Sequence, residues 1–517
     1  MKHDAIVVGG GVHGLAAAAL LARGGRGVLL LEARETLGGR AATAEFHPGF
    51  HAPGLDHTPA RLARRALEAL DLPAHGLETL EAPEPLFVPA ARGPGLLVEH
   101  DPARARAELS VRDGAAYADW RAFLARVRPV ISRALSAPAP DPFSAEPADL
   151  WSLLRSALDL RRLGREDMLE LLRVLPMSAA DWLNERFESP LLAAALAAPA
   201  LRAGVNGPRA PHTAGLLLLR ECAGELAVRG DTAALAAALE RAARAAGCEL
   251  RTGTRVTAIE LDRAAGCARA VRTARGEELE AGTIVSAIDP RRTLLDLVGA
   301  RALEPRVLDE LEAFRCRGTT AVVRLALASP LTFRARPGVR FEHASFGGDL
   351  DDLERAFDPL KYAALPERPW LDVRVPTVSR PELAPAGHHL ATIEVHAVGR
   401  PRPGPAAGAG GGDWDAEQRA ALLENVLRRL GEVSELPASS ILASELWTPG
   451  DVEREFGLSG GHLHHGEVAF DQLLFLRPGV SCPRHRTPVA GLWLAGPGTH
   501  PGGLSLLESA LNCVAAL

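Results

Sequence analysis

Lysine is almost absent from this chain. Only Lys2 and Lys361 occur among 517 residues, and arginine supplies the rest of the positive charge. The formal net charge is −6, and the arginines are scattered and matched by acidic residues. We interpret them as solvated helix faces. The composition therefore gives no reason to expect nucleic acid as a partner.

Closely spaced cysteine pairs are also missing. No two of the six cysteines form a C-x-x-C pair, and none has the spacing of zinc ligands. We therefore expect no dithiol redox centre and no metal site, but free buried thiols in a reducing cytosol. The cysteines are Cys222, Cys248, Cys267, Cys316, Cys482 and Cys513.

Long hydrophobic runs are a third absence. No uninterrupted apolar run reaches the ~18 residues that a membrane helix needs, and residues 5–8 have the pattern of a strand, not of a signal peptide. We expect a cytoplasmic protein. The arginine-bearing stretch 151–165 could make it membrane-peripheral, although packing against a sheet is the simpler interpretation.

The beginning of the chain has the pattern strand, glycine turn, helix, strand. Residues 4–8 and 28–31 are apolar strands, and residues 15–23 predict a helix of small and apolar side chains. Residues 283–287 and 492–495 repeat the buried-strand pattern. Continuous apolar strands of this kind are typical of parallel sheets covered on both faces.

A dinucleotide-binding fingerprint lies in this opening unit. Gly9-x-Gly11-x-x-Gly14 follows the first strand, and Glu32 ends the second. Gly9 permits the tight turn, Gly11 lets the backbone approach a pyrophosphate, and Gly14 lets helix and strand pack closely. The helix N-terminus favours the negative charge, and Glu32 can accept hydrogen bonds from ribose hydroxyls. A strand before the glycines and a helix after them support this interpretation.

The residues after Glu32 indicate which dinucleotide binds. Residues 32–43 resemble the E-x-x-x-x-x-G-G-R-x-x-T extension of the flavin amine oxidase and phytoene desaturase superfamily, in which the segment wraps the pyrophosphate of FAD. The resemblance implies FAD as the cofactor, while a plain Gly-Gly turn stays the alternative. The candidate binding residues of this region are Gly9, Gly11, Val12, His13, Gly14, Glu32, Ala33, Arg34, Gly38, Gly39 and Arg40.

Further stretches are similar to the same superfamily. Residues 250–259 resemble its middle segment, which implies that the Val256 backbone meets the adenine. Residues 491–503 resemble the C-terminal flavin motif of phytoene desaturases and carotenoid isomerases, which implies that Gly496, Gly498, Gly502 and Gly503 approach the flavin. Phrases such as Phe456-Gly457-Leu458 and Asp471-Gln472-Leu473 resemble the branch that includes pyridine nucleotide-disulphide oxidoreductase domain-containing protein 2.

The chain departs from these relatives at two places. Asp231 follows Arg229-Gly230 where relatives read R-G-G, and Leu504 and Leu507 replace glycines after the C-terminal motif. Leucine removes room for close backbone approach and disfavours a positive φ, so the last helix, expected from about residue 505, could be displaced. Asp231 could act as a catalytic base or orient a cationic substrate, but helix N-capping is the simpler alternative.

Histidines give one catalytic candidate and one cluster. His500 lies beside the expected flavin turn and could hydrogen-bond the cofactor or substrate, or could be structural. His462, His464 and His465 look like metal ligands, but flanking glycines favour a solvent-exposed or pocket-lining turn. The catalytic candidates are therefore His500 and Asp231.

The pattern predicts a two-domain α/β fold. By resemblance, a discontinuous Rossmann-like FAD-binding domain comprises residues 1–72, 215–300 and 456–517, and an inserted substrate domain of mixed sheet and helices comprises residues 73–214 and 301–455. Long helices are expected at residues 116–135 and 150–163, and a surface loop at residues 399–413. The substrate cavity is expected between the two domains.

The resemblance implies a desaturase or dehydrogenase. A hydride would pass from a substrate C–H bond to flavin N5, and a proton would leave to a base or to solvent, so that a C=C or C=N bond forms. Oxygen or a quinone would reoxidise the flavin. A small molecule is the expected substrate, with an apolar one among the alternatives. A redox-neutral isomerase and a flavin-binding protein with lost or structural function are the alternatives, the latter because of Leu504 and Leu507.

Overall fold

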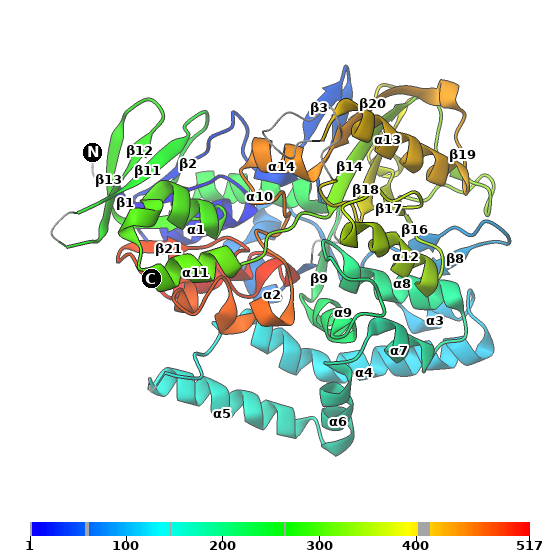
Figure 1. Cartoon of the computed structure of the whole chain (residues 1–517), viewed down its shortest axis with the longest axis horizontal. Coiled ribbons are helices and arrows are strands. Elements are labelled where there is room, and N and C mark those ends of the chain that lie inside the picture. Colours follow the sequence, from blue (N-terminus) through cyan, green and yellow to red (C-terminus); the bar gives the residue numbers. More distant parts are fainter. Residues whose placement is uncertain (1–2, 57–60, 145, 263–264, 402–413) are drawn as a thin grey trace.

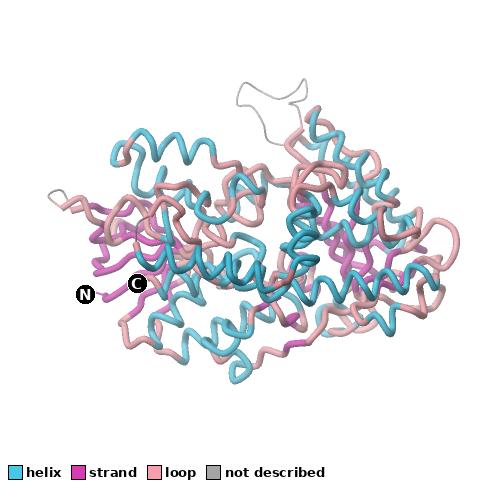
Figure 2. The backbone as a smooth tube through the Cα atoms, turned by 90° about the horizontal axis from the view of Figure 1, so that it is seen from below, coloured by secondary structure: helices cyan, strands magenta, loops and turns pink. Residues whose placement is uncertain are grey.

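The computed structural model describes residues 3–56, 61–144, 146–262, 265–401 and 414–517. The molecule is elongated, with one large sheet near each end and helices between and around them (Figures 1 and 2). Both ends of the chain lie near the same sheet (Figure 2). The α/β fold is therefore as predicted, whereas most of the loop expected at residues 399–413 lies outside the described residues.

The first sheet is parallel at its centre. Its strand order is β10-β2-β1-β13-β12-β11, with β21 beside β13, and β1, β2, β10, β13 and β21 run parallel where they pair. The strands are β1 (His3–Val8), β2 (Val28–Leu31), β10 (Glu249–Arg251), β11 (Val256–Leu261), β12 (Ala268–Thr273), β13 (Glu278–Ser286) and β21 (Leu492–Leu494). Segments from the start, middle and end of the chain thus share one sheet.

Alternate side chains of this sheet enter two cores. Ala5 and Val7 of β1 pack under α1 (Val12–Arg23), α10 (Asp231–Ala245) and α15 (Glu508–Ala515). Ile6 and Val8 face the opposite core, which includes residues of α11 (Pro305–Ala313). Burial on both faces explains why the strand sequences are continuously apolar and do not alternate.

The second sheet is mostly antiparallel, in the order β20-β14-β18-β17-β16-β7-β8. α13 (Ala416–Gly431) covers one face of it with Leu422, Val426 and Leu430. The strands are β7 (Leu86–Val88), β8 (Leu96–Val98), β14 (Thr320–Leu327), β16 (His343–Phe346), β17 (Trp370–Arg374), β18 (His389–His396) and β20 (Ile441–Trp447).

A helical layer packs beside the second sheet. Trp120 of α4 and Trp182 of α7 share its core, with their ring centroids 6.1 Å apart. Leu217 and Leu218 of α9 join that core, so the domain division expected at residue 215 falls inside a helix packed with this layer. The helices are α4 (Val111–Ser136), α7 (Ala179–Asn184), α8 (Pro190–Leu201), α9 (Thr213–Cys222) and α12 (Leu350–Lys361).

Two further helices, α5 (Pro147–Arg162) and α6 (Arg165–Val174), extend along the lower edge of the molecule in Figure 1. Asp149 and Asp159 of α5 form ion pairs with Arg484 and Arg133 of the body. The helices expected at residues 116–135 and 150–163 are confirmed as α4 and α5. Within the described ranges, no helix has the length and apolar character to cross a membrane.

The remaining elements are short. They are β3 (Ala44–His47), β4 (Phe50–Ala52), β5 (Arg61–Leu62), α2 (Arg64–Leu70), β6 (Thr79–Leu80), α3 (Pro102–Ala105), β9 (Leu226–Val228), β15 (Thr332–Phe333), β19 (Ser434–Glu435) and α14 (Pro449–Phe456). The last helix begins at Glu508, three residues later than expected, because Gly502–Leu504 forms a separate 3-10 turn.

Candidate functional site

The glycine turn between β1 and α1 has the geometry of a pyrophosphate cradle. Gly9 has φ +100°, and a Cβ on Gly14 would lie 1.9 Å from the carbonyl oxygen of Gly9, so neither position tolerates a side chain. A Cβ on Gly11 would meet no atom within 4 Å. The turn is therefore closed against the protein at Gly14 and open to a ligand at Gly11.

Glu32 fixes this turn to the chain that follows β2. The backbone N–H of Gly10 donates to Glu32 Oε2 over 2.6 Å, and that of Arg34 donates to Oε1 over 2.9 Å. Each carboxylate oxygen can accept two hydrogen bonds and accepts one from these backbone groups, so each keeps capacity for a ligand hydroxyl. Glu32 is buried yet lines the adjoining cavity.

That cavity, called here the dinucleotide hollow, has a volume of about 1340 Å³ and is lined from both ends of the chain. That volume includes the space at the mouth of the hollow that is open to solvent. The sequence-predicted residues that line it are Gly9, Gly11, Val12, His13, Glu32, Ala33, Arg34, Gly38, Gly39, Arg40 and Val256.

The predicted C-terminal glycines lie behind this lining. A Cβ on Gly496 would lie 2.9 Å from the carbonyl oxygen of Ala287, and one on Gly498 would lie 2.3 Å from Pro290. Gly503 packs against His464 in the same way, and Gly502 has φ +77°. The C-terminal segment that carries these glycines lies close to the hollow, and two of its residues, Pro497 and Leu506, line the hollow.

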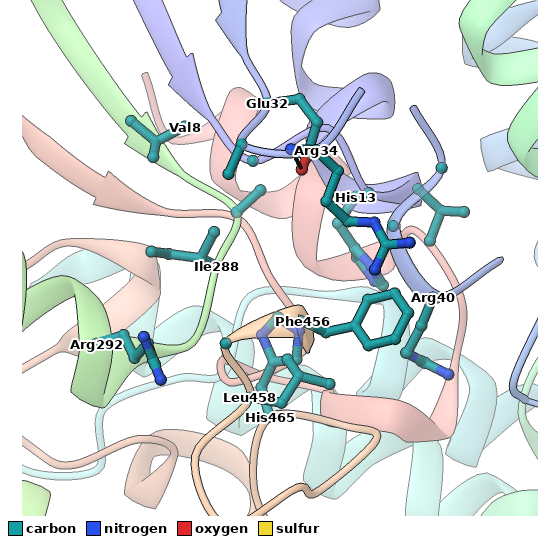
Figure 3. A pocket seen from close by; sticks show the side chains of 18 of the residues that line it. Val8, His13, Glu32, Arg34, Arg40, Ile288, Arg292, Phe456, Leu458 and His465 are labelled. Atoms are coloured by element: carbon teal, nitrogen blue, oxygen red, sulfur yellow. Dashed lines mark hydrogen bonds between the residues drawn. The ribbon is translucent and has the colours of Figure 1, made fainter. Parts of the chain in front are cut away.

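Sequence reasoning missed several lining residues. Phe456, Arg292 and Ile288 face the hollow opposite or beside the glycine turn (Figure 3), and the Arg34 guanidinium lies 4.4 Å from the Phe456 ring centroid. Phe456 belongs to a phrase noted for family resemblance, but nothing in its sequence context assigned it a position. Its role depends on α14, which comes from a distant part of the chain.

Two histidines present unpartnered nitrogens in the hollow. His13 Nε2 and His465 Nδ1 are buried and have no hydrogen-bond partner among the described residues. Burial, reinforced by Arg40, lowers the pKa of His13 to about 3, and burial also lowers the pKa of His465. Both imidazoles are neutral at pH 7, so each offers one polar atom to a ligand.

The remaining members of the histidine cluster are also buried, so of the two alternatives the solvent-exposed turn is wrong, whereas the pocket-lining turn is confirmed for His464 and His465. His462 Nε2 hydrogen-bonds with the Ala203 carbonyl over 3.0 Å, and His464 lines a second cavity. No group of three or more His, Cys, Asp or Glu side chains suited to a metal ion occurs in the part of the chain that the structure describes. All six cysteines are free.

The two catalytic candidates lie outside the dinucleotide hollow. Asp231 is the first residue of α10, accepts a hydrogen bond from the Ala233 N–H over 2.8 Å and pairs with Arg380 at a neighbouring cavity. His500 Nε2 donates to the Ala134 carbonyl over 3.1 Å, and burial lowers its pKa to about 4. Their catalytic roles stay predictions.

Leu507 contradicts the expectation that leucine would bar a positive φ. Leu507 has φ +66° and a fully buried side chain in the core under α1. The left-handed conformation costs about 1–2 kcal/mol, and burying a leucine contributes roughly 1.5–3 kcal/mol. Burial therefore offsets the strain. Leu504 has no such strain and lines the second cavity.

The second cavity, called here the arginine cavity, has a volume of about 1200 Å³. Thr232 and Leu506 line both it and the dinucleotide hollow. Its walls include Trp120, Leu196 and Leu504, but also Arg61 and several other charged residues. The glycine turn, the helix N-terminus, the Glu32 carboxylate and the unpartnered imidazoles fit a bound dinucleotide, and the adjoining cavity provides space for a second molecule.

Comparison with known proteins gives consistent matches along the chain. A family model described as flavin containing amine oxidoreductase matches residues 14–512. Pyridine nucleotide-disulfide oxidoreductase domain-containing protein 2 of Rattus norvegicus is 28% identical over 535 residues, which cover 97% of this chain and 91% of that protein. Hydroxyneurosporene desaturase of Rhodobacter capsulatus is 28% identical, covering 96% of this chain and 94% of the desaturase.

A solved structure of similar fold covers the whole chain. An oxidoreductase from Methanosarcina mazei superposes with a TM-score of 0.56 at 16% identity, over 100% of this chain and 99% of that one. At this identity the likeness concerns the fold alone.

Proposed function

The chain belongs to the family of flavin containing amine oxidoreductases, and from that membership we propose that it desaturates or dehydrogenates a small molecule, forming a C=C or C=N bond. It is an FAD-dependent oxidoreductase. The observation that supports the finer proposal is the arginine cavity, because Thr232 and Leu506 place it directly beside the dinucleotide hollow.

The residues divide into cofactor-holding and substrate-holding groups. The Gly11 backbone and the N-terminus of α1 would hold the pyrophosphate, and Glu32 the ribose hydroxyls. When bound, FAD supplies an acceptor for a hydride, with its two electrons, from a substrate C–H bond. Leu504 and Leu506 give the arginine cavity apolar surface, and Leu506 lines the dinucleotide hollow as well.

An anaerobic titration tests this proposal. The purified protein is mixed with panels of amines and of acyl compounds, and both flavin absorbance and product mass are followed. We expect the flavin to bleach, a product two hydrogen atoms lighter to form, and oxygen or a quinone to restore the colour. A product of unchanged mass would contradict dehydrogenation and would indicate a redox-neutral isomerisation instead. Gly11→Val, expected to lack flavin, is the control.

We also propose that α5 contacts a membrane surface. Asp149 and Asp159 pair with the body, whereas Leu150, Trp151 and Leu154 are 55%, 62% and 51% exposed. At 100° per residue these apolar side chains lie on the side opposite the aspartates, so the helix turns its apolar face to solvent. Exposed arginines, Arg155, Arg161 and Arg162, accompany this face. An apolar face with flanking arginines fits an anionic lipid surface.

Vesicle co-sedimentation tests the membrane proposal. Wild-type protein should sediment with vesicles containing phosphatidylserine and much less with vesicles of phosphatidylcholine alone. Trp151→Glu together with Leu154→Glu should abolish sedimentation without changing flavin content, whereas Val111→Glu, also at an exposed apolar residue, should not. Self-association of the wild type that the double substitution removes, without vesicle binding, would identify α5 as an interface between copies instead.

A further inference from the structure

The arginine cavity combines apolar walls with charged side chains of both signs, because the carboxylates Asp56, Glu84 and Glu221 line it together with several arginines. Tyr117 and Trp120 of α4 and Leu196 of α8 form apolar surface. Four arginines line the same space, and they come from separate parts of the chain: Arg61, Arg121, Arg202 and Arg220. A purely hydrocarbon ligand would leave these guanidinium groups in an apolar environment, which is costly.

Two of these arginines have carboxylate partners. Arg202 pairs with Asp372 and, over 2.9 Å, with Glu394. Arg121 pairs with Glu221 over 3.1 Å. The side chains of Arg202 and its two partners are almost fully buried, so this group is a compensated internal ion cluster.

Arg61 and Arg220 lack such partners. Arg61 donates to the backbone carbonyl of Glu221 over 3.2 Å, and Arg220 donates to that of Arg202 over 3.2 Å. Neither forms an ion pair with a carboxylate in the described ranges, and the Nε atom of each is buried without a hydrogen-bond partner. Burial is the main cause that lowers the pKa of Arg61. Burial also lowers the pKa of Arg220, to about 10.

Both arginines line a cavity that adjoins the dinucleotide hollow, because Thr232 and Leu506 line both spaces. Arg61 precedes Leu62, which forms a β-bridge with Leu506. Arg220 shares the cavity lining with His464, which packs against Gly503 of the C-terminal turn. A ligand held in the arginine cavity would therefore lie beside the hollow.

We propose that Arg61 and Arg220 bind the anionic oxygen group, a carboxylate or a phosphate, of a substrate whose apolar carbon skeleton occupies the rest of the arginine cavity. This inference rests on the proposed function, because it names the substrate class of that reaction. Guanidinium groups suit such oxyanions, since their N–H donors form charge-assisted hydrogen bonds. The anion supplies the missing partners of both arginines.

Isothermal titration calorimetry of the FAD-loaded protein tests the proposal without turnover. The probes are octanoate, octyl phosphate, octan-1-ol and octylamine. We expect one or both anions to bind at least tenfold more tightly than octan-1-ol or octylamine. The better of the two anions identifies the oxygen group. Equal binding of octanoate, octyl phosphate and octan-1-ol would overturn the proposal, as would a preference for octylamine.

Substitutions assign the binding to the two arginines. Arg220→Met and Arg61→Met should each weaken anion binding at least tenfold, and Arg220→Lys should retain most of it. Arg209→Met is the matched control, because Arg209 is exposed and pairs with Asp351 on the surface. Unchanged anion binding in a folded Arg220→Met protein would overturn the proposal. Since binding, flavin content and flavin bleaching are measured separately, loss of the proposed reaction alone would leave this result intact.

Discussion

The dinucleotide hollow and the arginine cavity are neighbours with different kinds of lining. In the hollow, the glycine turn and the Glu32 carboxylate lie within residues 9–40, and later segments up to Leu506 complete the lining. In the arginine cavity, Arg61, Arg121 and Arg220 come from segments far apart in sequence. A ligand bound by backbone imposes glycine spacing on the sequence, whereas a ligand bound by side chains imposes no spacing.

Burial also has different effects on the charge of side chains in the two cavities. His13 and His465 in the hollow respond to burial by remaining neutral, which costs little. Arg61 and Arg220 remain charged at pH 7 even though burial lowers their pKa. The two imidazoles therefore add no charge to the hollow, whereas Arg61 and Arg220 keep their charge inside the arginine cavity.

The largest expected effect is on folding. Gly14→Val places a side chain where even a Cβ would lie 1.9 Å from the Gly9 carbonyl oxygen. Helix and strand cannot then pack, so we expect loss of soluble folded protein, measured by circular dichroism and yield. Gly431→Ala, where a Cβ would meet nothing within 4 Å, is the control. A folded, flavin-containing Gly14→Val protein would show that the turn is not under this constraint.

The second prediction distinguishes loss of FAD binding from loss of the fold. Gly11→Val meets no protein atom within 4 Å of the new Cβ and keeps an extended backbone. We expect a folded protein whose apo melting temperature matches that of flavin-stripped wild type, but which purifies without FAD. If this variant purifies with stoichiometric FAD, the pyrophosphate does not bind at the open side of the turn.

A pH series compares histidines of the two cavities. The folded-state pKa is about 3 for His13 in the hollow and about 4 for His100 in the arginine cavity, both below the ordinary value of 6.5. Each contributes stability that is complete above about pH 6.5 and lost as pH falls toward the folded pKa, by about 1.4 kcal/mol per pH unit. His13→Gln and His100→Gln should each make denaturation midpoints less sensitive to acid between pH 6 and 4. An unchanged slope would mean that the histidine is already protonated in the fold.

A smaller effect concerns the ribose end of the hollow. Glu32→Ala removes a charged acceptor and should weaken FAD binding by roughly 1–3 kcal/mol. Fluorescence titration of the apoprotein with FAD measures the change. Glu32→Gln should bind with intermediate strength, because its amide keeps one acceptor oxygen. FAD affinity equal to wild type in Glu32→Ala would exclude a ribose contact.

The smallest effect concerns the C-terminal segment that borders both cavities. At Leu507, with φ +66°, glycine should be more stable than alanine by about 1 kcal/mol, the reverse of the usual order near a helix. Urea denaturation of Leu507→Gly and Leu507→Ala measures this difference. Greater stability of the alanine protein would contradict the left-handed conformation.

The sequence-based prediction succeeded where the physics is local. The strand and helix around the fingerprint and the other buried strands depend on neighbouring residues, whereas FAD followed from the resemblance of residues 32–43 to a known superfamily. The prediction failed where distant segments meet. His462 and His464 are buried by contacts with residues from other elements, and Leu507 keeps a strained backbone because a core formed by α1 and α10 holds its side chain. No local pattern encodes those contacts.

The sheet that carries the hollow also has a consequence for biosynthesis. Val8 and Leu506 both line the hollow, and at about 5–20 residues per second they leave the ribosome roughly 25–100 s apart. Early in that interval β1 lacks its later neighbour β13 and β2 lacks β10, and α15 cannot yet cover their face. The lining of the hollow is therefore complete only after Leu506 has been synthesised.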